Sequence, residues 1–179
     1  MNFKSALKKA ASAALCISVL AGSTAVISDT QTVQASADSI SYTTDSMENF
    51  SIDGYTDEEV DMICAVVERE VGGLSVQSKQ IVASVIVNRV KSSAFPDTVY
   101  DVLHQENQFK TIRNYYTNER PVQVSTRIAV TYALKSGIDC ADGALFFYAP
   151  AVIDSIDKTN WFESNLEFVI EVDGQRYFR

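Results

Sequence analysis

The sequence predicts an α+β fold, a helical domain with a small antiparallel sheet or hairpin at the C-terminus. Two observations support this prediction. Apolar residues recur at helical spacing between residues 56 and 137, and from residue 144 onward short apolar runs and an alternation of period two replace them. Because the helical segments come first and the strand segments last, the strands are expected to pair with one another rather than to alternate with helices.

The first predicted helix begins at Thr56, which forms a T-x-x-E capping box with Glu59. It ends at Gly72-Gly73, a common C-terminal signal. Between these ends, apolar residues recur at the spacing of one helical face, namely at Val60, Ile63, Cys64, Val67 and Val71. One side of this helix is therefore expected to be buried.

The middle of the chain predicts three further elements and a loop. Residues 77–90 are almost continuously apolar, and although their β-branched content would suit a buried strand, their length favours a buried central helix. A short helix is expected over 99–103, and the polar and aromatic residues 106–116 are expected to form a loop. The next helix is predicted to begin at Pro121 and to end at Gly137.

The last part of the chain predicts strands. Residues 144–148, A-L-F-F-Y, form a strand-like apolar run. Residues 166–179 alternate in polarity, turn at Asp173-Gly174 and return, which is the pattern of a β-hairpin.

The N-terminus has the three parts of a secretory signal peptide. A basic start is followed by a small and apolar segment over 10–27 and by an A-x-A cleavage site at Ala35–Ala37. A membrane anchor is the alternative, but Ala, Ser, Thr and Gly dilute the apolar run. We therefore expect a signal peptide over 1–37, secretion, and no stable membrane insertion after cleavage. Residues 38–54, rich in Ser, Thr and Asp, are predicted to be a linker or a poorly ordered mature N-terminus, and residues 55–179 the domain.

Charge and cysteine content restrict the possible partners. The formal net charge is −8, and loss of residues 1–37 would make it more negative. An acidic chain argues against nucleic acid as a partner. Cys64 and Cys140 could pair outside the cell, but Cys64 lies on an apolar helix face, where a buried free thiol is common.

Two glutamates stand near the end of the first predicted helix. Successive residues rotate by about 100° around a helix. If the apolar stripe is centred near Val60 and Val67, Glu68 falls on an acidic, solvated side together with Asp57 and Asp61. Glu68 is therefore expected to be a surface charge.

Glu70 falls instead beside apolar residues and in the last turn of the same helix. The negative end of the helix dipole and partial burial both favour the protonated form of a carboxyl group there. A general acid that works near neutral pH needs this property. The alternative is a structural role for Glu70, paired with a cation such as Arg69 or Arg89.

Other catalytic groups are scarce. The single histidine, His104, argues against a catalytic zinc site, because such sites usually take three protein ligands with histidine dominant. We expect no metal and no other cofactor. A cysteine–histidine hydrolase could use Cys64 or Cys140 with His104, but a nucleophilic cysteine needs a helix N-terminus or a cationic neighbour. With the zinc and cysteine mechanisms disfavoured, the sequence favours a mechanism that uses a carboxyl group.

Several motifs, in order from about Ile63 to the end, resemble the spore cortex-lytic cell-wall hydrolases of the SleB/CwlJ type. The segment E-V-G-G at 70–73, followed by Q-I-V-A-S-V-I-V-N-R-V at 80–90, resembles the family's E-x-x-G … A-V-A-A-V-x-x-N-R-V. Residues 95–102 resemble its F-P-x-T-V-x-x-V, Gln108-Phe109 its Q-F pair, and 143–148 its G-A-x-x-F-[HY] strand. Trp161 resembles a tryptophan beyond that strand, and 174–179 the closing segment.

The resemblance implies a fold of lysozyme-like general character and places the family's catalytic glutamate on Glu70, counting back from Asn88. It also implies a secreted enzyme, associated with the cell wall or spore cortex, that acts on peptidoglycan glycan strands, commonly as a lytic transglycosylase. Two positions depart from the family pattern: Gly72 stands where it usually has Arg, and Leu74 where it often has a second acid.

Further site residues remain candidates. Phe109, Phe147, Tyr148 and Trp161 could stack on sugar rings or simply pack, and Gln108 could bind a sugar or hold a loop. A two-carboxylate hydrolase would need a partner acid within roughly 5–9.5 Å of Glu70, for which Asp139, Asp142, Asp154 and Glu163 are available. Two other functions stay open: an N-acetylmuramoyl-L-alanine amidase or stem-peptide peptidase, and a non-catalytic wall or spore-coat protein that kept the fold.

Overall fold

The structure is a computed structural model that describes residues 52, 54–152 and 156–179. The predicted signal peptide and most of the predicted linker lie outside these residues. The first elements of the described chain are α2 (Asp57–Val71), α3 (Val76–Lys91) and α4 (Val99–His104). They are followed by η3 (Lys110–Ile112), α5 (Arg113–Thr117), α6 (Val124–Lys135), β1 (Phe146–Tyr148), α7 (Ile156–Asn165), β2 (Phe168–Val172) and β3 (Gln175–Phe178).

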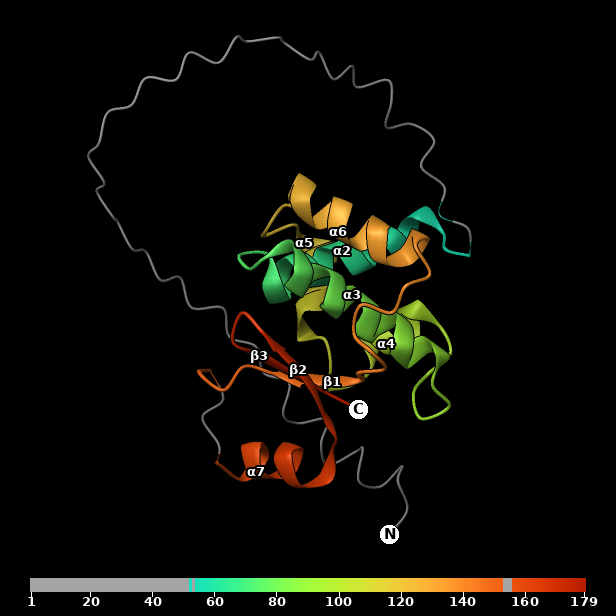
Figure 1. Cartoon of the computed structure of the whole chain (residues 1–179). Helices are drawn as coiled ribbons and strands as arrows, with labels where there is room; N and C mark the ends of the chain where they lie inside the picture. The colour runs from blue at the N-terminus through green and yellow to red at the C-terminus, as the bar shows by residue number, and fades with distance from the viewer. Residues whose placement is uncertain (1–51, 53, 153–155) are drawn as a thin grey trace, which may run out of the picture.

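The predicted order of elements is confirmed, since a helical domain precedes a small antiparallel sheet. The sheet has the strand order β1-β3-β2, and both pairs are antiparallel. The helices α2 to α6 lie on one side of this sheet and α7 lies on the other (Figure 1). The side chains of β1 show both contacts: Phe147 joins the large helical core, whereas Phe146 and Tyr148 join a second apolar cluster with Phe162 of α7.

The two long helices form for the reasons that the sequence indicates. In the capping box of α2, Thr56 accepts a hydrogen bond from the backbone N–H of Glu59, and the Glu59 side chain accepts one from the backbone N–H of Thr56. The apolar segment from 77 to 90 is helical, and α3 is the central helix, packed against α2, α4 and α6. Ser75 caps its first turn by accepting a hydrogen bond from Ser78 N–H.

Three predictions of local structure need correction. Residues 106–116, predicted as a loop, contain η3 and most of α5, because the aromatic and polar side chains of this segment pack against α2. Helix α6 begins at Val124 rather than at Pro121. Helix α7 was not predicted, and its only buried residue, Phe162, leaves little apolar periodicity to detect.

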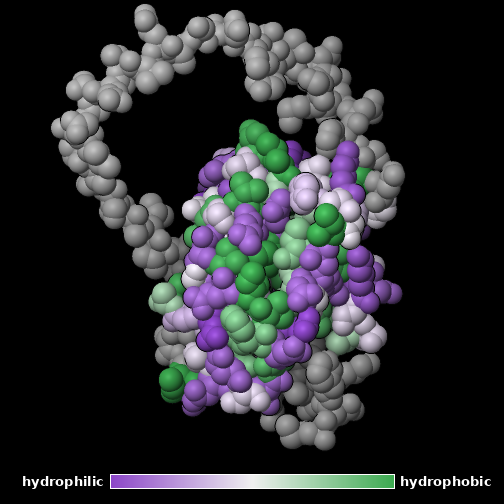
Figure 2. All heavy atoms as spheres, in the orientation of Figure 1, coloured by the Kyte–Doolittle hydropathy of each residue, from purple (hydrophilic) through white to green (hydrophobic). Residues whose placement is uncertain are grey.

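The surface carries apolar side chains as well as charges. Figure 2 shows hydrophobic patches interspersed with polar side chains on the face seen in Figure 1. Helix α6 exposes Val124, Ile128 and Tyr132 at a spacing of four residues. None of the helices in the described part of the chain has the length and apolar character that a membrane span requires.

Candidate active site

Glu70 lies in the last turn of α2 and is partly buried. Its Oε1 atom accepts a hydrogen bond from the Thr111 hydroxyl, at 2.5 Å. Thr111 belongs to η3, which packs against α2. The segment that the sequence predicted as a loop therefore fixes the orientation of the Glu70 carboxyl group.

A buried cation lies near Glu70. Arg89 is only 3% exposed. Its Nε donates to the carbonyl oxygen of Leu145 at 2.7 Å, and its Nη1 donates to Oε1 of Gln108 at 3.0 Å. Its guanidinium carbon lies 4.8 Å from the centre of the Phe109 ring. Burial lowers the pKa of Arg89 to about 10, and the negative charge of Glu70 opposes this shift. Arg89 is therefore charged at neutral pH, supports the Gln108-Phe109 pair, and acts electrostatically on Glu70.

The turn between β2 and β3 is fastened to the loop that follows Glu70. Oδ2 of Asp173 accepts hydrogen bonds from the Ser75 N–H at 3.0 Å and from the Ser78 hydroxyl at 2.7 Å. These bonds hold the pKa of Asp173 below its usual value. Asp173 and Gly174 both have positive φ, at 51° and 75°, as the predicted hairpin turn requires. The hairpin thus anchors the start of α3 close to the end of α2.

Glu68 corrects the prediction of a surface charge, because its side chain is fully buried. Its Oε1 accepts from Nε of Arg120 at 3.1 Å. Its Oε2 accepts from the Gln123 backbone N–H at 3.2 Å and from the Thr126 hydroxyl at 2.5 Å. The start of α6 and the loop before it cover this side of α2, so the helix is buried on two sides near its end. Periodicity within α2 could not reveal a covering element that lies more than 50 residues away.

The buried carboxylate also explains Gly72. A Cβ atom at this position would collide with the backbone oxygen and the carboxyl group of Glu68. Glycine therefore leaves the space into which Glu68 folds. The glycine at position 72 and the burial of Glu68 are thus parts of one arrangement.

The predicted sugar-binding residues divide between the two faces of the sheet. Gln108, Phe109 and Phe147 lie on the side of the helical core, where the two phenylalanine rings are 6.4 Å apart. Tyr148 and Trp161 belong to the cluster on the α7 side. Less than a tenth of Gln108, Phe109, Phe147 or Tyr148 is exposed, and Trp161 is half-buried. The structure therefore shows packing for the four most buried residues, and binding of a sugar by any of the five stays a prediction.

The candidate second acids have structural contacts of their own. Asp139 accepts hydrogen bonds from the Asn88 side chain at 3.0 Å and from the Ala141 N–H at 2.9 Å.

Glu163 accepts from the Tyr148 hydroxyl at 2.6 Å and from Arg176 at 2.7 Å. Asp142 pairs with Arg179 on the surface, and Asp154 lies outside the described residues.

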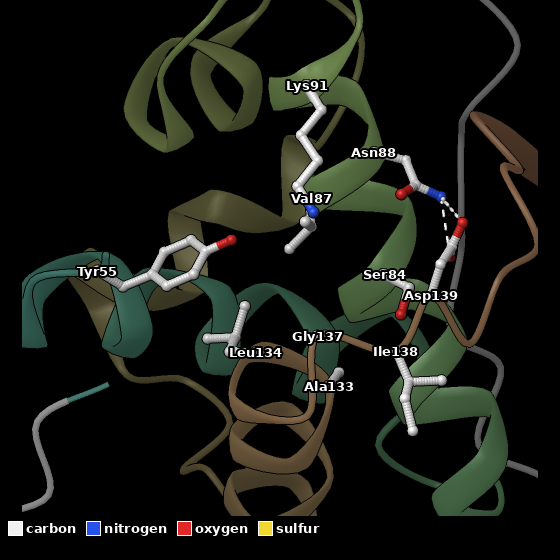
Figure 3. A pocket seen from close by; sticks show the side chains of 10 residues that line it. All are labelled: Tyr55, Ser84, Val87, Asn88, Lys91, Ala133, Leu134, Gly137, Ile138 and Asp139. Carbon is white, nitrogen blue, oxygen red and sulfur yellow. Dashed lines mark hydrogen bonds between the residues drawn. The ribbon is translucent and has the colours of Figure 1, made fainter. Parts of the chain in front are cut away.

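A small pocket lies away from Glu70. It is bounded by α3, α6 and the segment after α6, and Asn88 and Asp139 meet at its edge (Figure 3). Neither Glu70 nor Thr111 lines it. Its lining is Tyr55, Ser84, Val87, Asn88, Lys91, Ala133, Leu134, Gly137, Ile138 and Asp139.

The groups of the alternative chemistries are not assembled. Cys64 and Cys140 are free thiols, and burial raises the pKa of Cys64 to about 12. Nδ1 of His104 lies 2.7 Å from the Tyr100 carbonyl oxygen and Nε2 lies 2.8 Å from the Tyr116 hydroxyl. Within residues 52, 54–152 and 156–179, no three His, Cys, Asp or Glu side chains gather in a way that could hold a metal ion. The expected absence of a metal stays a prediction.

Two proteins similar in sequence to this chain are both described as spore cortex-lytic enzymes. A spore cortex-lytic enzyme of Halalkalibacterium halodurans is 31% identical over 97 residues, which cover 54% of this chain and 29% of that protein. A spore cortex-lytic enzyme of Oceanobacillus iheyensis is 30% identical over 97 residues, covering 54% and 34%. The chain thus matches only about a third of the length of these relatives.

Two solved structures share the fold. The catalytic domain of the germination-specific lytic transglycosylase SleB from Bacillus anthracis superposes with a TM-score of 0.61 at 24% identity, covering 71% of this chain and 98% of that domain. The catalytic domain of the Bacillus cereus SleB protein gives a TM-score of 0.60 at 22% identity, covering 71% and 94%. The similarity confirms the predicted lysozyme-like α+β fold.

The family assignment covers most of the described domain. The model of the Cell Wall Hydrolase family matches residues 73–178, a span that begins three residues after Glu70. This span contains the N-R-V, Q-F and G-A-x-x-F-Y motifs on which the resemblance rests. The chain belongs to the Cell Wall Hydrolase family, of the SleB/CwlJ type.

Proposed function

We propose that this chain is a secreted enzyme that cleaves the glycan strands of peptidoglycan as a lytic transglycosylase, with Glu70 as its catalytic residue. The observation that most supports this proposal is the environment of Glu70. Its carboxyl group is partly buried at the end of α2, is oriented by Thr111, and interacts electrostatically with the buried Arg89. The fold that holds it matches a domain described as the catalytic domain of a lytic transglycosylase.

One carboxyl group suffices for this reaction. Protonated Glu70 donates its proton to the glycosidic oxygen, the bond from that oxygen to C1 of the muramyl residue breaks, and the other strand leaves with a free hydroxyl group. The Glu70 carboxylate then takes the proton from the 6-hydroxyl of the same muramyl residue. The oxygen of that hydroxyl bonds to C1, so that a 1,6-anhydro end forms and no water is consumed.

The structural contacts of two of the candidate acids, Asp139 and Glu163, support a single-carboxylate mechanism. Asp139 stabilises the loop at 139–143, and Glu163 holds Tyr148 and Arg176. Both are thus engaged in the fold, whereas a two-carboxylate hydrolase needs a second acid that is free to act on water or on the sugar.

Secretion and wall location complete the proposal. The A-x-A site after a basic start and an apolar segment motivates cleavage after Ala37. The relatives described as spore cortex-lytic enzymes make the cortex, or the wall in general, the place of action. N-terminal sequencing of the exported protein should give a chain that begins near Asp38, and recovery of the intact chain from membranes would contradict this.

The decisive test is the chemistry of the products. Purified peptidoglycan is incubated with the protein, and the new ends are identified by mass spectrometry. The proposal requires 1,6-anhydro-muramic ends. Reducing ends would show a hydrolase, free stem peptides would show an amidase or peptidase, and an unchanged substrate would favour a non-catalytic wall or coat protein.

A further inference from the structure

The backbone of Arg120, a loop residue, is held by a side chain at both its N–H and its carbonyl oxygen. Its backbone N–H donates to Oδ1 of Asn114, and its carbonyl oxygen accepts from Nδ2 of the same side chain, each at 2.8 Å. The Asn114 side chain also donates to the carbonyl oxygen of Ala65 at 3.2 Å. Asn114 thereby ties the backbone of Arg120 to α2.

The side chain of Arg120 is fixed at one end and available at the other. Its Nε donates to the fully buried Glu68 carboxylate. Nη1 and Nη2 donate to no atom of the described residues, and 32% of the side chain is exposed. Of the five N–H groups of the guanidinium, the four on Nη1 and Nη2 therefore remain available to a ligand.

The available end of Arg120 lies at the helix end that carries Glu70. Its Nη2 is 3.9 Å from the position that a Cβ of Gly73 would take, and Gly73 follows Glu70 by three residues. Glu68 and Glu70 are about 200° apart around α2. Thr111 thus approaches the last turn from one side, and Arg120 reaches past the end of the helix from the other.

We propose that Arg120 is a specificity-determining residue that binds a carboxylate of a peptidoglycan stem peptide beside the scissile glycan. This inference rests on the proposed function. A guanidinium whose Nη groups are free can hold a carboxylate through two parallel hydrogen bonds. Because the chain has a formal net charge of −8, an anionic substrate needs such a local, fixed cation.

The rival explanation is a structural one. A cation near the last carbonyl groups of α2 also interacts favourably with the helix dipole, and Arg120 neutralises the buried Glu68. Both roles predict a loss of stability when Arg120 is changed. Only the proposed role predicts a change in the preference for carboxylate-bearing substrate, so preference is the quantity to measure.

The test compares solubilised native peptidoglycan with the same material whose carboxylates have been converted to methylamides. For the unchanged protein, we expect an apparent KM about 10-fold lower on the native substrate, since a charge-assisted contact worth about 1.4 kcal/mol is a factor of ten. Arg120→Gln should bring this ratio close to one and leave kcat within about twofold. Arg127→Gln, which breaks a surface ion pair with Asp61, is the matched control and should keep the ratio.

Two further variants guard against misfolding. Glu68→Gln/Arg120→Gln leaves no buried charge unpaired and should also lose the preference. Arg120→Lys keeps the positive charge but lacks the planar guanidinium group that can donate two parallel hydrogen bonds. This variant should retain only part of the preference for the native substrate. Persistence of the full preference in Arg120→Gln or in the double variant would overturn the proposal.

Binding to insoluble wall fragments, measured by co-sedimentation, separates this inference from the proposed function. If the unchanged protein releases no glycan ends but binds native fragments better than amidated ones, and Arg120→Gln removes that difference, the proposed function fails and the carboxylate site stands. If the unchanged protein releases anhydro ends equally from both substrates, the proposed function stands and the inference about Arg120 is wrong.

Discussion

The two sides of the last turns of α2 carry the same residue type in opposite settings. Glu68 is fully buried and accepts hydrogen bonds from Arg120, Gln123 and Thr126. Glu70 is partly exposed and is oriented by a hydroxyl group. A carboxylate that is closed off from solvent and already accepts three hydrogen bonds from the protein serves the fold. A carboxyl group that retains exposure can meet a substrate and exchange a proton with it.

The largest effect on stability is expected from removing the buried carboxylate. Glu68→Ala leaves the Thr126 hydroxyl and the Gln123 N–H without their acceptor, and should lower the free energy of unfolding by about 3 kcal/mol. Urea unfolding followed by circular dichroism measures this. Asp61→Ala, on the same helix but in an exposed ion pair with Arg127, should cost at most about 1 kcal/mol. Equal losses in the two variants would show that the buried contacts of Glu68 stabilise the fold no more than an exposed ion pair does.

The difference between the two glutamates marks what the sequence could and could not predict. The capping box, the glycine pair and the apolar spacing of α2 are local signals, and they correctly located both ends of the helix. The helical rotation separated Glu70 from Glu68 but misplaced Glu68 on the surface. The residues that bury Glu68 are 52 to 58 positions further along the chain, at Arg120, Gln123 and Thr126, and no local pattern reports a contact of that range.

The candidate active site likewise depends on long-range contacts that the sequence does not reveal. Family motifs pointed to Glu70 and to the Gln108-Phe109 pair, but not to Thr111, which lies in a segment predicted to be a loop. The sequence offers Arg89, of the N-R-V motif, as a possible partner of Glu70. The contacts of Arg89 with Gln108 and the Phe109 ring depend on tertiary packing, which the sequence pattern does not reveal. A short helical turn such as η3, with no buried residue of its own, carries too little apolar periodicity to be detected.

A smaller effect should come from filling the space beside the buried carboxylate. The backbone of Gly72 has ordinary helical angles, so Gly72→Ala is disfavoured only by the collision of its Cβ with Glu68. We expect a loss of roughly 1–3 kcal/mol in the free energy of unfolding. Adding Gly72→Ala to Glu68→Ala should cost less than the sum of the two, because the collision with the carboxyl group is gone and only the one with the backbone oxygen remains. If the losses in the free energy of unfolding were strictly additive, the packing of Gly72 against the Glu68 side chain would not be the cause.

The smallest effect is expected at the hairpin turn. The pKa of Asp173 is lowered by its hydrogen bonds to Ser75 and Ser78, so its stabilising contribution is complete above the unfolded-state pKa and is lost as the pH falls through the lower folded-state value. Asp173→Asn should therefore lower the stability at pH 7 by less than about 1 kcal/mol, because the group is exposed. The free energies of unfolding of Asp173→Asn and of the unchanged protein are measured from pH 7 down to pH 2. The difference between them should vanish at the acid end. A difference that grows as the pH falls would contradict this assignment.

The division of roles between the two glutamates is tested most directly by Glu70→Gln and Glu68→Gln, assayed together for anhydro-end formation on one peptidoglycan preparation and for urea unfolding. Glu70→Gln should unfold close to the urea concentration of the unchanged protein, losing only its attraction to Arg89. It should lose activity by about 10²-fold or more, because it keeps the shape but has no proton to transfer. Glu68→Gln should unfold at a clearly lower urea concentration and, where it is folded, keep its activity within a few-fold. An active Glu70→Gln protein, or a stable but inactive Glu68→Gln protein, would contradict the account and assign the catalytic role to Glu68.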